Sequence, residues 1–181
     1  MQSHSSFDAD ALPLYIHGLE GSAQGSKGTF MLNTFGRSGP NMPAKKGVSG
    51  GRPSSFETCI DVIKDYLDTH SASVLVGSSF GGAVTMAILQ RNIWHGPVVL
   101  LAPAIHYYGL DLDLPSEVHA IIIHDPQDDL IHFSGSEALH QANLNSSELW
   151  VSDGGHRLKT ITQNGLLEQA VRDQLKRARG H

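Results

Sequence analysis

The stretch Ser73-Val-Leu-Val-Gly-Ser-Ser-Phe-Gly81 decides the fold class of this chain. Its first four residues form a short apolar run, which is typical of a buried strand, and the run ends at Gly77. The apolar segment from Ala83 to Arg91 follows and is predicted to be a helix. The residues between them therefore place a Gly-x-Ser-x-Gly motif, centred on Ser79, at a strand-to-helix junction.

The same alternation of short apolar runs and helical patterns continues on both sides of this junction. Strands are predicted at residues 12–17, 97–102, 118–124 and 148–151, and helices at 27–36, 54–69, 134–142 and 166–178. A loop is expected over residues 40–51, with one short strand near 41–44. Apolar strands separated by helices predict a mostly parallel sheet covered on both faces. We expect an α/β protein, a single-domain three-layer α/β/α sandwich over residues 12–181, preceded by a disordered N-terminus at 1–11.

Composition excludes several classes of protein. With 181 residues, 40% hydrophobic and 17% charged, the chain has the size of one globular domain. A net charge of −5 argues against nucleic-acid binding, and the single Cys59 excludes a disulfide framework or a zinc site of paired thiolates. No apolar run reaches the ~18 residues of a membrane span. Residues 1–12 lack the basic and apolar regions of a signal peptide, so a cytoplasmic location is expected.

The residues at the strand ends carry the candidate chemistry, because ligands of parallel sheets bind outside the carboxyl ends of the strands. A sharp turn at the Gly-x-Ser-x-Gly motif would expose Ser79 above the sheet as a nucleophile. The backbone N–H of Phe80 would then supply one donor to an oxyanion. The loop after the first strand would supply the second from Leu19, whereas His17 is expected to be a structural, hydrogen-bonded histidine.

An acid and a base follow the later strands. Asp128 lies after the 118–124 strand, and His156 follows Gly154-Gly155 after the last strand. This order predicts that His156 takes the proton of Ser79 while Asp128 orients the imidazole. Two neighbouring carboxylates, those of Asp125 and Asp129, remain alternatives for the acid.

On these residues the sequence resembles the α/β-hydrolase superfamily, over roughly residues 13 to 158. The matching motifs are His17-Gly18, Gly77-x-Ser79-x-Gly81, the acid segment around Asp128, and Gly155-His156. The superfamily's acid segment often reads His-Gly-x-x-Asp-x-x-Val/Ile, and here Asp125 stands in place of the Gly. Within the superfamily the chain looks most like small, lid-poor esterases of the YqiA/YcfP-like kind. The resemblance implies a minimal α/β-hydrolase fold without a large cap.

Three other interpretations compete with a serine hydrolase. The loop from Gly21 to Lys27 is similar to a phosphate loop, but Ser26 separates its Gly from its Lys, which disfavours nucleotide binding. Alternatively, a metal-dependent hydrolase could use an acidic and histidine-containing segment, whose candidate ligands are His124, Asp125, Asp128, Asp129 and His132. Finally, the chain could be a non-catalytic binding protein, because folds of this kind also host receptors.

The favoured interpretation is a serine hydrolase that cleaves a carboxylic ester or thioester through an acyl-enzyme on Ser79. No cofactor or metal is implied, the expected partner is a small-molecule ester or thioester, and the oligomeric state stays open. The interval from Pro103 to Glu117, where many relatives carry a lid, is too short for a separate helical cap. We expect Tyr107 or Tyr108 to line an open acyl-binding pocket there.

Overall fold

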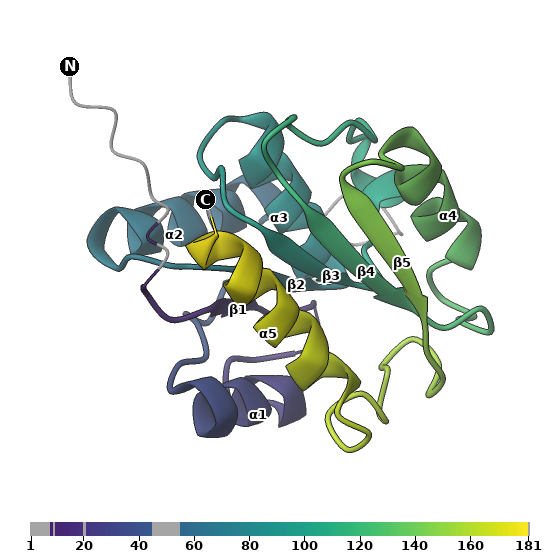
Figure 1. Cartoon of the computed structure of the whole chain (residues 1–181), viewed down its shortest axis with the longest axis horizontal. Helices are drawn as coiled ribbons and strands as arrows, with labels where there is room; N and C mark the ends of the chain where they lie inside the picture. The colour runs from purple at the N-terminus through teal and green to yellow at the C-terminus, as the bar shows by residue number, and fades with distance from the viewer. Residues whose placement is uncertain (1–7, 9, 20, 45–54, 181) are drawn as a thin grey trace.

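The structure is a computed structural model, and it describes residues 8, 10–19, 21–44 and 55–180. Its centre is a five-stranded sheet in which the strands lie in the order of the sequence (Figure 1). All four neighbouring pairs are parallel, which confirms the predicted parallel sheet. The strands are β1 (Leu14–Ile16), β2 (Leu75–Ser78), β3 (Val98–Leu101), β4 (Ala120–His124) and β5 (Ser147–Val151).

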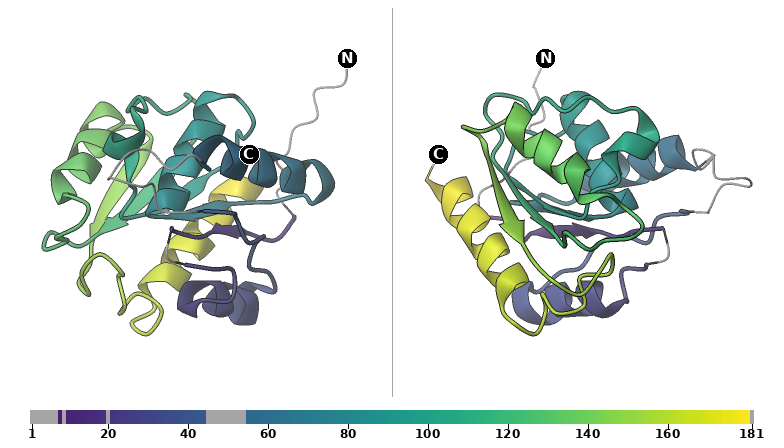
Figure 2. Two further views of the ribbon diagram at one scale, coloured as in Figure 1. Left: turned by 180° about the vertical axis from the view of Figure 1, so that it is seen from behind. Right: turned by 90° about the vertical axis from the view of Figure 1, so that its right-hand side faces the viewer.

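Helices cover both faces of this sheet (Figures 1 and 2). Helices α2, α3 and α4 lie on one face, and α1 and α5 lie on the other. The three-layer α/β/α sandwich is therefore confirmed. The helices are α1 (Ser26–Phe35), α2 (Phe56–Thr69), α3 (Phe80–Gln90), α4 (Phe133–Ala142) and α5 (Leu166–Arg179), and a short 3-10 helix, η2, spans Ile105–Tyr108.

Two hydrophobic cores hold the layers together, because successive residues of a strand point to opposite faces of the sheet. In β3, Val98 and Leu100 pack into the core under α2 and α3. Val99 and Leu101 pack into the other core, under α1 and α5. β3 and the first four residues of β4 are apolar and buried on both faces, and this is why they appear in the sequence as unbroken apolar runs.

The predicted strand at residues 41–44 is wrong, because this segment forms no ladder with any strand. The Met42 N–H donates to Nε2 of His17 at 2.8 Å, and the side chain of Asn41 accepts the N–H of Ala23. The bond to His17 engages the backbone N–H of Met42, which in a strand would pair with a neighbouring strand. Residues 45–51 of the expected loop lie outside the described residues.

The ends of the elements also differ slightly from prediction. Helix α3 begins at Phe80 rather than Ala83, because the motif turn itself opens the helix. Most of the expected disordered N-terminus lies outside the described residues, and the described Asp8 donates its N–H to Ala72 O at 2.9 Å. In the Pro103–Glu117 interval only η2 is regular, so no helical cap forms there. Within the described part of the chain, no helix combines the length and apolarity that crossing a bilayer requires.

Candidate active site

Ser79 occupies a strained turn between β2 and α3. Its backbone has φ 54° and ψ −111°, and non-glycine residues rarely adopt a positive φ. The neighbouring glycines permit the turn: a Cβ on Gly81 would lie 2.1 Å from Ile16 O, and one on Gly77 would lie 2.3 Å from Oγ1 of Thr85. Such strain persists where the surrounding structure enforces it, which is characteristic of functional sites.

The structure brings Ser79, His156 and Asp128 into one hydrogen-bonded chain. Ser79 Oγ lies 3.0 Å from Nε2 of His156, and Nδ1 of His156 lies 2.8 Å from Oδ2 of Asp128. A carboxylate only accepts, so Nδ1 carries the imidazole proton and the lone pair of Nε2 faces the Ser79 hydroxyl. This is the tautomer that a general base requires.

Asp128 is buried, with 5% of its surface exposed, and both carboxylate oxygens are bonded. Oδ1 accepts the backbone N–H groups of Leu130 and Ile131 at 2.9 and 2.8 Å. Oδ2 accepts from His156 and also lies 3.0 Å from Nε2 of His124. Burial alone would raise the pKa of Asp128, but the bonds from Ile131, His156 and Leu130 outweigh it and lower the pKa below its ordinary value. The carboxylate is therefore ionised in the folded protein.

His124, the last residue of β4, is a buried neutral imidazole against this acid. Its Nε2 faces two acceptors, Oδ2 of Asp128 and the backbone oxygen of Ile131, and so it carries the proton. Its Nδ1 then accepts the hydroxyl of Ser136 at 2.8 Å. Burial lowers the pKa of His124 even though the Asp128 carboxylate opposes the change.

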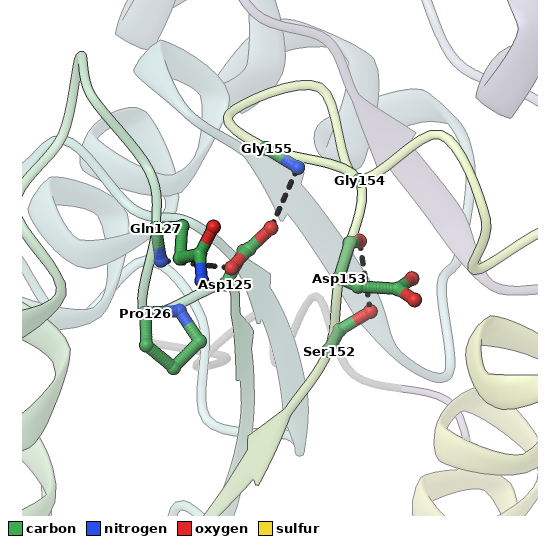
Figure 3. A pocket seen from close by; sticks show the side chains of 7 residues that line it. All are labelled: Asp125, Pro126, Gln127, Ser152, Asp153, Gly154 and Gly155. Carbon is green, nitrogen blue, oxygen red and sulfur yellow. Dashed lines mark hydrogen bonds between the residues drawn. The ribbon is translucent and has the colours of Figure 1, made fainter.

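The metal-site hypothesis finds no support in this geometry. Within the described ranges, no three or more His, Cys, Asp or Glu side chains are grouped so as to hold an ion. His124 and Asp128 bond to each other as described, and His132 is exposed at the start of α4. The other two carboxylates of the segment point elsewhere: Asp129 is exposed, and Asp125 accepts backbone N–H groups from its own turn and from the loop before His156 (Figure 3).

The loop after β1 is held against the nucleophile turn. His17 is buried and donates from Nδ1 to Gly18 O at 2.8 Å, while its Nε2 accepts the N–H of Met42. A Cβ on Gly18 would lie 3.5 Å from Cβ of Ser79, so the two turns are in close contact. Leu19 and Phe80, the two residues expected to donate to an oxyanion, both line the cavity at Ser79.

A cavity of about 650 Å³ opens in front of Ser79 and His156. Both expected tyrosines line it. The hydroxyl of Tyr107 donates to Leu130 O at 3.0 Å, and Tyr107 is 57% exposed. Tyr108 is buried and stacks on Phe56, with ring centroids 4.6 Å apart. The volume is in the range typical of sites for small molecules.

Sequence reasoning did not identify the basic residues that line this cavity. Lys27, in the first turn of α1, donates from Nζ to Arg157 O at 2.5 Å. Lys159, two residues after Arg157, also lines the cavity. Burial and the charge of Arg157 lower the pKa of Lys27 to about 8. In the sequence, only the glycine-rich loop before Lys27 pointed to this region. The contact of Lys27 with the loop after β5 could not be predicted, because it depends on the tertiary fold.

Comparison of sequences assigns the chain to a family. Residues 12–117, more than half of the chain, match the family described as "Uncharacterised protein family (UPF0227)". The chain belongs to this family. The matched region contains β1, the Ser79 turn and the short η2 interval, but it ends before the segment that holds Asp128 and His156. No curated protein matches the sequence.

Solved structures show the same fold. A protein from Xanthomonas campestris pv. campestris assigned to the alpha/beta hydrolase superfamily is 21% identical, with a TM-score of 0.73 over 98% of this chain and 99% of that one. An alpha-beta serine hydrolase homologue from Coxiella burnetii is 18% identical (TM-score 0.68; 92% and 86% covered). Mouse alpha/beta hydrolase domain-containing protein 10 is 15% identical (TM-score 0.68; 91% and 89% covered). The chain therefore has the α/β-hydrolase fold.

Proposed function

We propose that this protein is a serine hydrolase that cleaves a carboxylic ester or thioester. The observation that carries the proposal is the hydrogen-bonded chain from Ser79 through His156 to Asp128, whose first member stands on a strained turn at the cavity. Nucleophile, base and orienting acid each stand within bonding distance of the next, which is the arrangement that acyl transfer by a serine requires.

In the proposed reaction, Ser79 Oγ attacks the acyl carbon while Nε2 of His156 takes its proton. The buried Asp128 carboxylate stabilises the imidazolium that forms. The backbone N–H groups of Leu19 and Phe80 bind the oxyanion of the tetrahedral intermediate. His156 then gives the proton to the departing alcohol or thiol. Water, deprotonated by the same imidazole, releases the acid from Ser79.

The structure also bears on the choice between an enzyme and a binding protein. A binding protein has no need of a strained serine whose hydroxyl lies 3.0 Å from a correctly protonated imidazole. The cavity supports a small acyl substrate, because apolar groups of Leu19, Tyr108 and Ile131 line it beside the nucleophile.

The decisive experiment is covalent labelling with a serine-directed fluorophosphonate, together with hydrolysis of p-nitrophenyl esters and acyl-CoA thioesters. The wild-type protein should be labelled at Ser79 and should hydrolyse at least one class of substrate. The Ser79→Ala variant should lose both, whereas Ser78→Ala should keep most of the labelling. Full labelling of the Ser79→Ala variant would refute the proposed nucleophile.

A further inference from the structure

The Asp125 carboxylate joins two loops that are distant in the sequence (Figure 3). Asp125 directly follows β4, and its Oδ2 accepts the backbone N–H of Gly155 at 2.7 Å. Its Oδ1 accepts the backbone N–H of Gln127 at 2.8 Å. The residue is 6% exposed, so both bonds are largely sheltered from water. Hydrogen bonds to an ionised carboxylate are stronger than bonds between neutral groups, and here one of them crosses between loops.

Other bonds also hold the loop that receives this one: Leu158 N–H donates to Gly155 O at 2.9 Å, Thr160 Oγ1 donates to Asp153 O at 3.1 Å, and Lys27 Nζ donates to Arg157 O. The Asp125 bond ties the backbone N–H of Gly155 to the turn after β4. Gly154 and Gly155 both have positive φ, 99° and 67°, and glycine is the residue with the widest choice of backbone conformations. A Cβ on Gly154 would lie 2.7 Å from Lys159 N, so that glycine is packed against backbone, whereas a Cβ on Gly155 would meet no atom within 4 Å. His156 comes next in the chain, and its ring position therefore depends on how the two glycines are fixed.

We propose that Asp125 is a positioning residue that holds the Gly154-Gly155 turn so that Nε2 of His156 faces Ser79. The proposal rests on the proposed function, because it assigns Asp125 a part in placing the general base. Asp125 acts through Gly155 and does not reach the reacting atoms.

The division of work between the two carboxylates follows from their directions. Asp128 points to the imidazole and bonds Nδ1, which sets the tautomer of His156. Asp125, three residues earlier, bonds the backbone N–H of Gly155 and thereby fixes the position of the His156 imidazole. A misplacement of about 1 Å at a catalytic group can cost on the order of 10²-fold in rate, so loss of the Asp125 bond should be measurable.

The test compares Asp125→Ala, Asp125→Asn and the control Asp129→Asn, using the most active ester found for the wild-type protein. Asp125→Ala should lower kcat by ~10- to 100-fold and leave KM within about twofold. Asp125→Asn keeps one acceptor oxygen and should fall between Asp125→Ala and the wild type. Asp129→Asn removes the same charge from an exposed position of the same loop and should keep the wild-type kcat.

A second readout separates positioning from general loss of structure. Amide hydrogen exchange, followed by NMR, should be faster at Gly155 in both Asp125 variants, whereas Ile122 in the centre of β4 should keep its protection. If Asp125→Ala does not fold, Asp125→Asn decides by the same two measurements. A folded Asp125 variant with wild-type kcat, or with unchanged exchange at Gly155, would overturn the proposal. Activity that survives in Ser79→Ala would instead overturn the proposed function, so the two failures are distinguishable.

Discussion

Nε2 of His124 and Nδ1 of His156 both lie within 3.0 Å of the same oxygen, Oδ2 of Asp128. With the two backbone N–H groups on Oδ1, the carboxylate accepts four hydrogen bonds. A carboxylate has about four acceptor positions, so all of them are occupied here and the orientation of the Asp128 carboxylate is fixed. The buried imidazole of His124 therefore helps to hold Asp128 in place while Oδ2 accepts the N–H of His156 at the cavity.

Replacing Asp128 by Asn should lower turnover on the order of 10⁴-fold, because an amide in this position allows the wrong tautomer of His156. The measurement is kcat for ester hydrolysis at neutral pH. Asp125→Asn should cost far less, and Asp129→Asn should cost nothing measurable. A larger loss in either of these variants than in Asp128→Asn would move the acid to that position.

His124→Asn should weaken catalysis by ~10-fold, since Asp128 would lose one charge-assisted hydrogen bond worth about 1.5–3 kcal/mol, part of which the amide N–H₂ of Asn can restore. His124→Phe removes the donor while keeping a ring and should cost more. We expect the loss in kcat rather than in KM, because His124 does not line the cavity. Equal activity of the Phe variant and the wild type would exclude a positioning effect of His124 on Asp128.

The stability of the protein should fall as the pH drops below about 6.5, in part because of His124. Burial lowers the pKa of His124 in the folded state. As the pH falls, the unfolded chain therefore binds a proton at a higher pH than the folded protein does, and this proton stabilises the unfolded state. The effect begins near the ordinary pKa of 6.5 and ends below the folded pKa. His119, whose pKa burial also lowers, contributes in the same direction. Thermal denaturation of His124→Asn should show a weaker decrease in Tm from pH 7 to pH 5 than the wild type.

Lys27 should reduce stability at neutral pH and do so less as the pH rises. Its pKa of about 8 lies below the ordinary 10.5, so the unfolded chain holds the proton more tightly between these values. Folding stability contributed by this group therefore increases through that window. We expect the Tm of the wild type to rise relative to that of Lys27→Met as the pH increases from 7 to 9.5. An exposed control, Lys64→Met, should show no such shift, since Lys64 lies on the outer face of α2 in an ion pair with Asp68.

The cavity should favour short acyl chains. Between β3 and β4 only the four residues of η2 form regular structure, and Tyr107 leaves the cavity open to solvent. An open pocket buries few methylenes, each worth about 0.8 kcal/mol, so kcat/KM should stop rising after a few carbons. A series of p-nitrophenyl esters from acetate to palmitate measures this. A sharp increase in rate at the critical micelle concentration would contradict it, because such activation needs a lid.

The positions of the strands, the helices and the nucleophile turn were predictable from the sequence. Each depends on local patterns, namely apolar runs, the three- and four-residue spacing of apolar residues, and the glycines around Ser79. Any other residue at these glycine positions would place a Cβ against neighbouring backbone atoms. The predicted strand at 41–44 failed because the backbone N–H of Met42 donates to the side chain of His17, which is distant in the sequence, and the segment forms no ladder. Nothing local in that segment indicates such a contact.

The choice among Asp125, Asp128 and Asp129 shows what only the tertiary structure decided. All three carboxylates follow β4 within five residues, and their chemistry is the same. The turn after β4 directs one toward His156, one toward the backbone of Gly155 and one into solvent. Their roles differ because loops from β4 and β5 meet at one sheet edge, where the parallel pairing of these strands brings His124 beside Val151. Contacts across that edge depend on three-dimensional direction, which neither residue type nor spacing encodes.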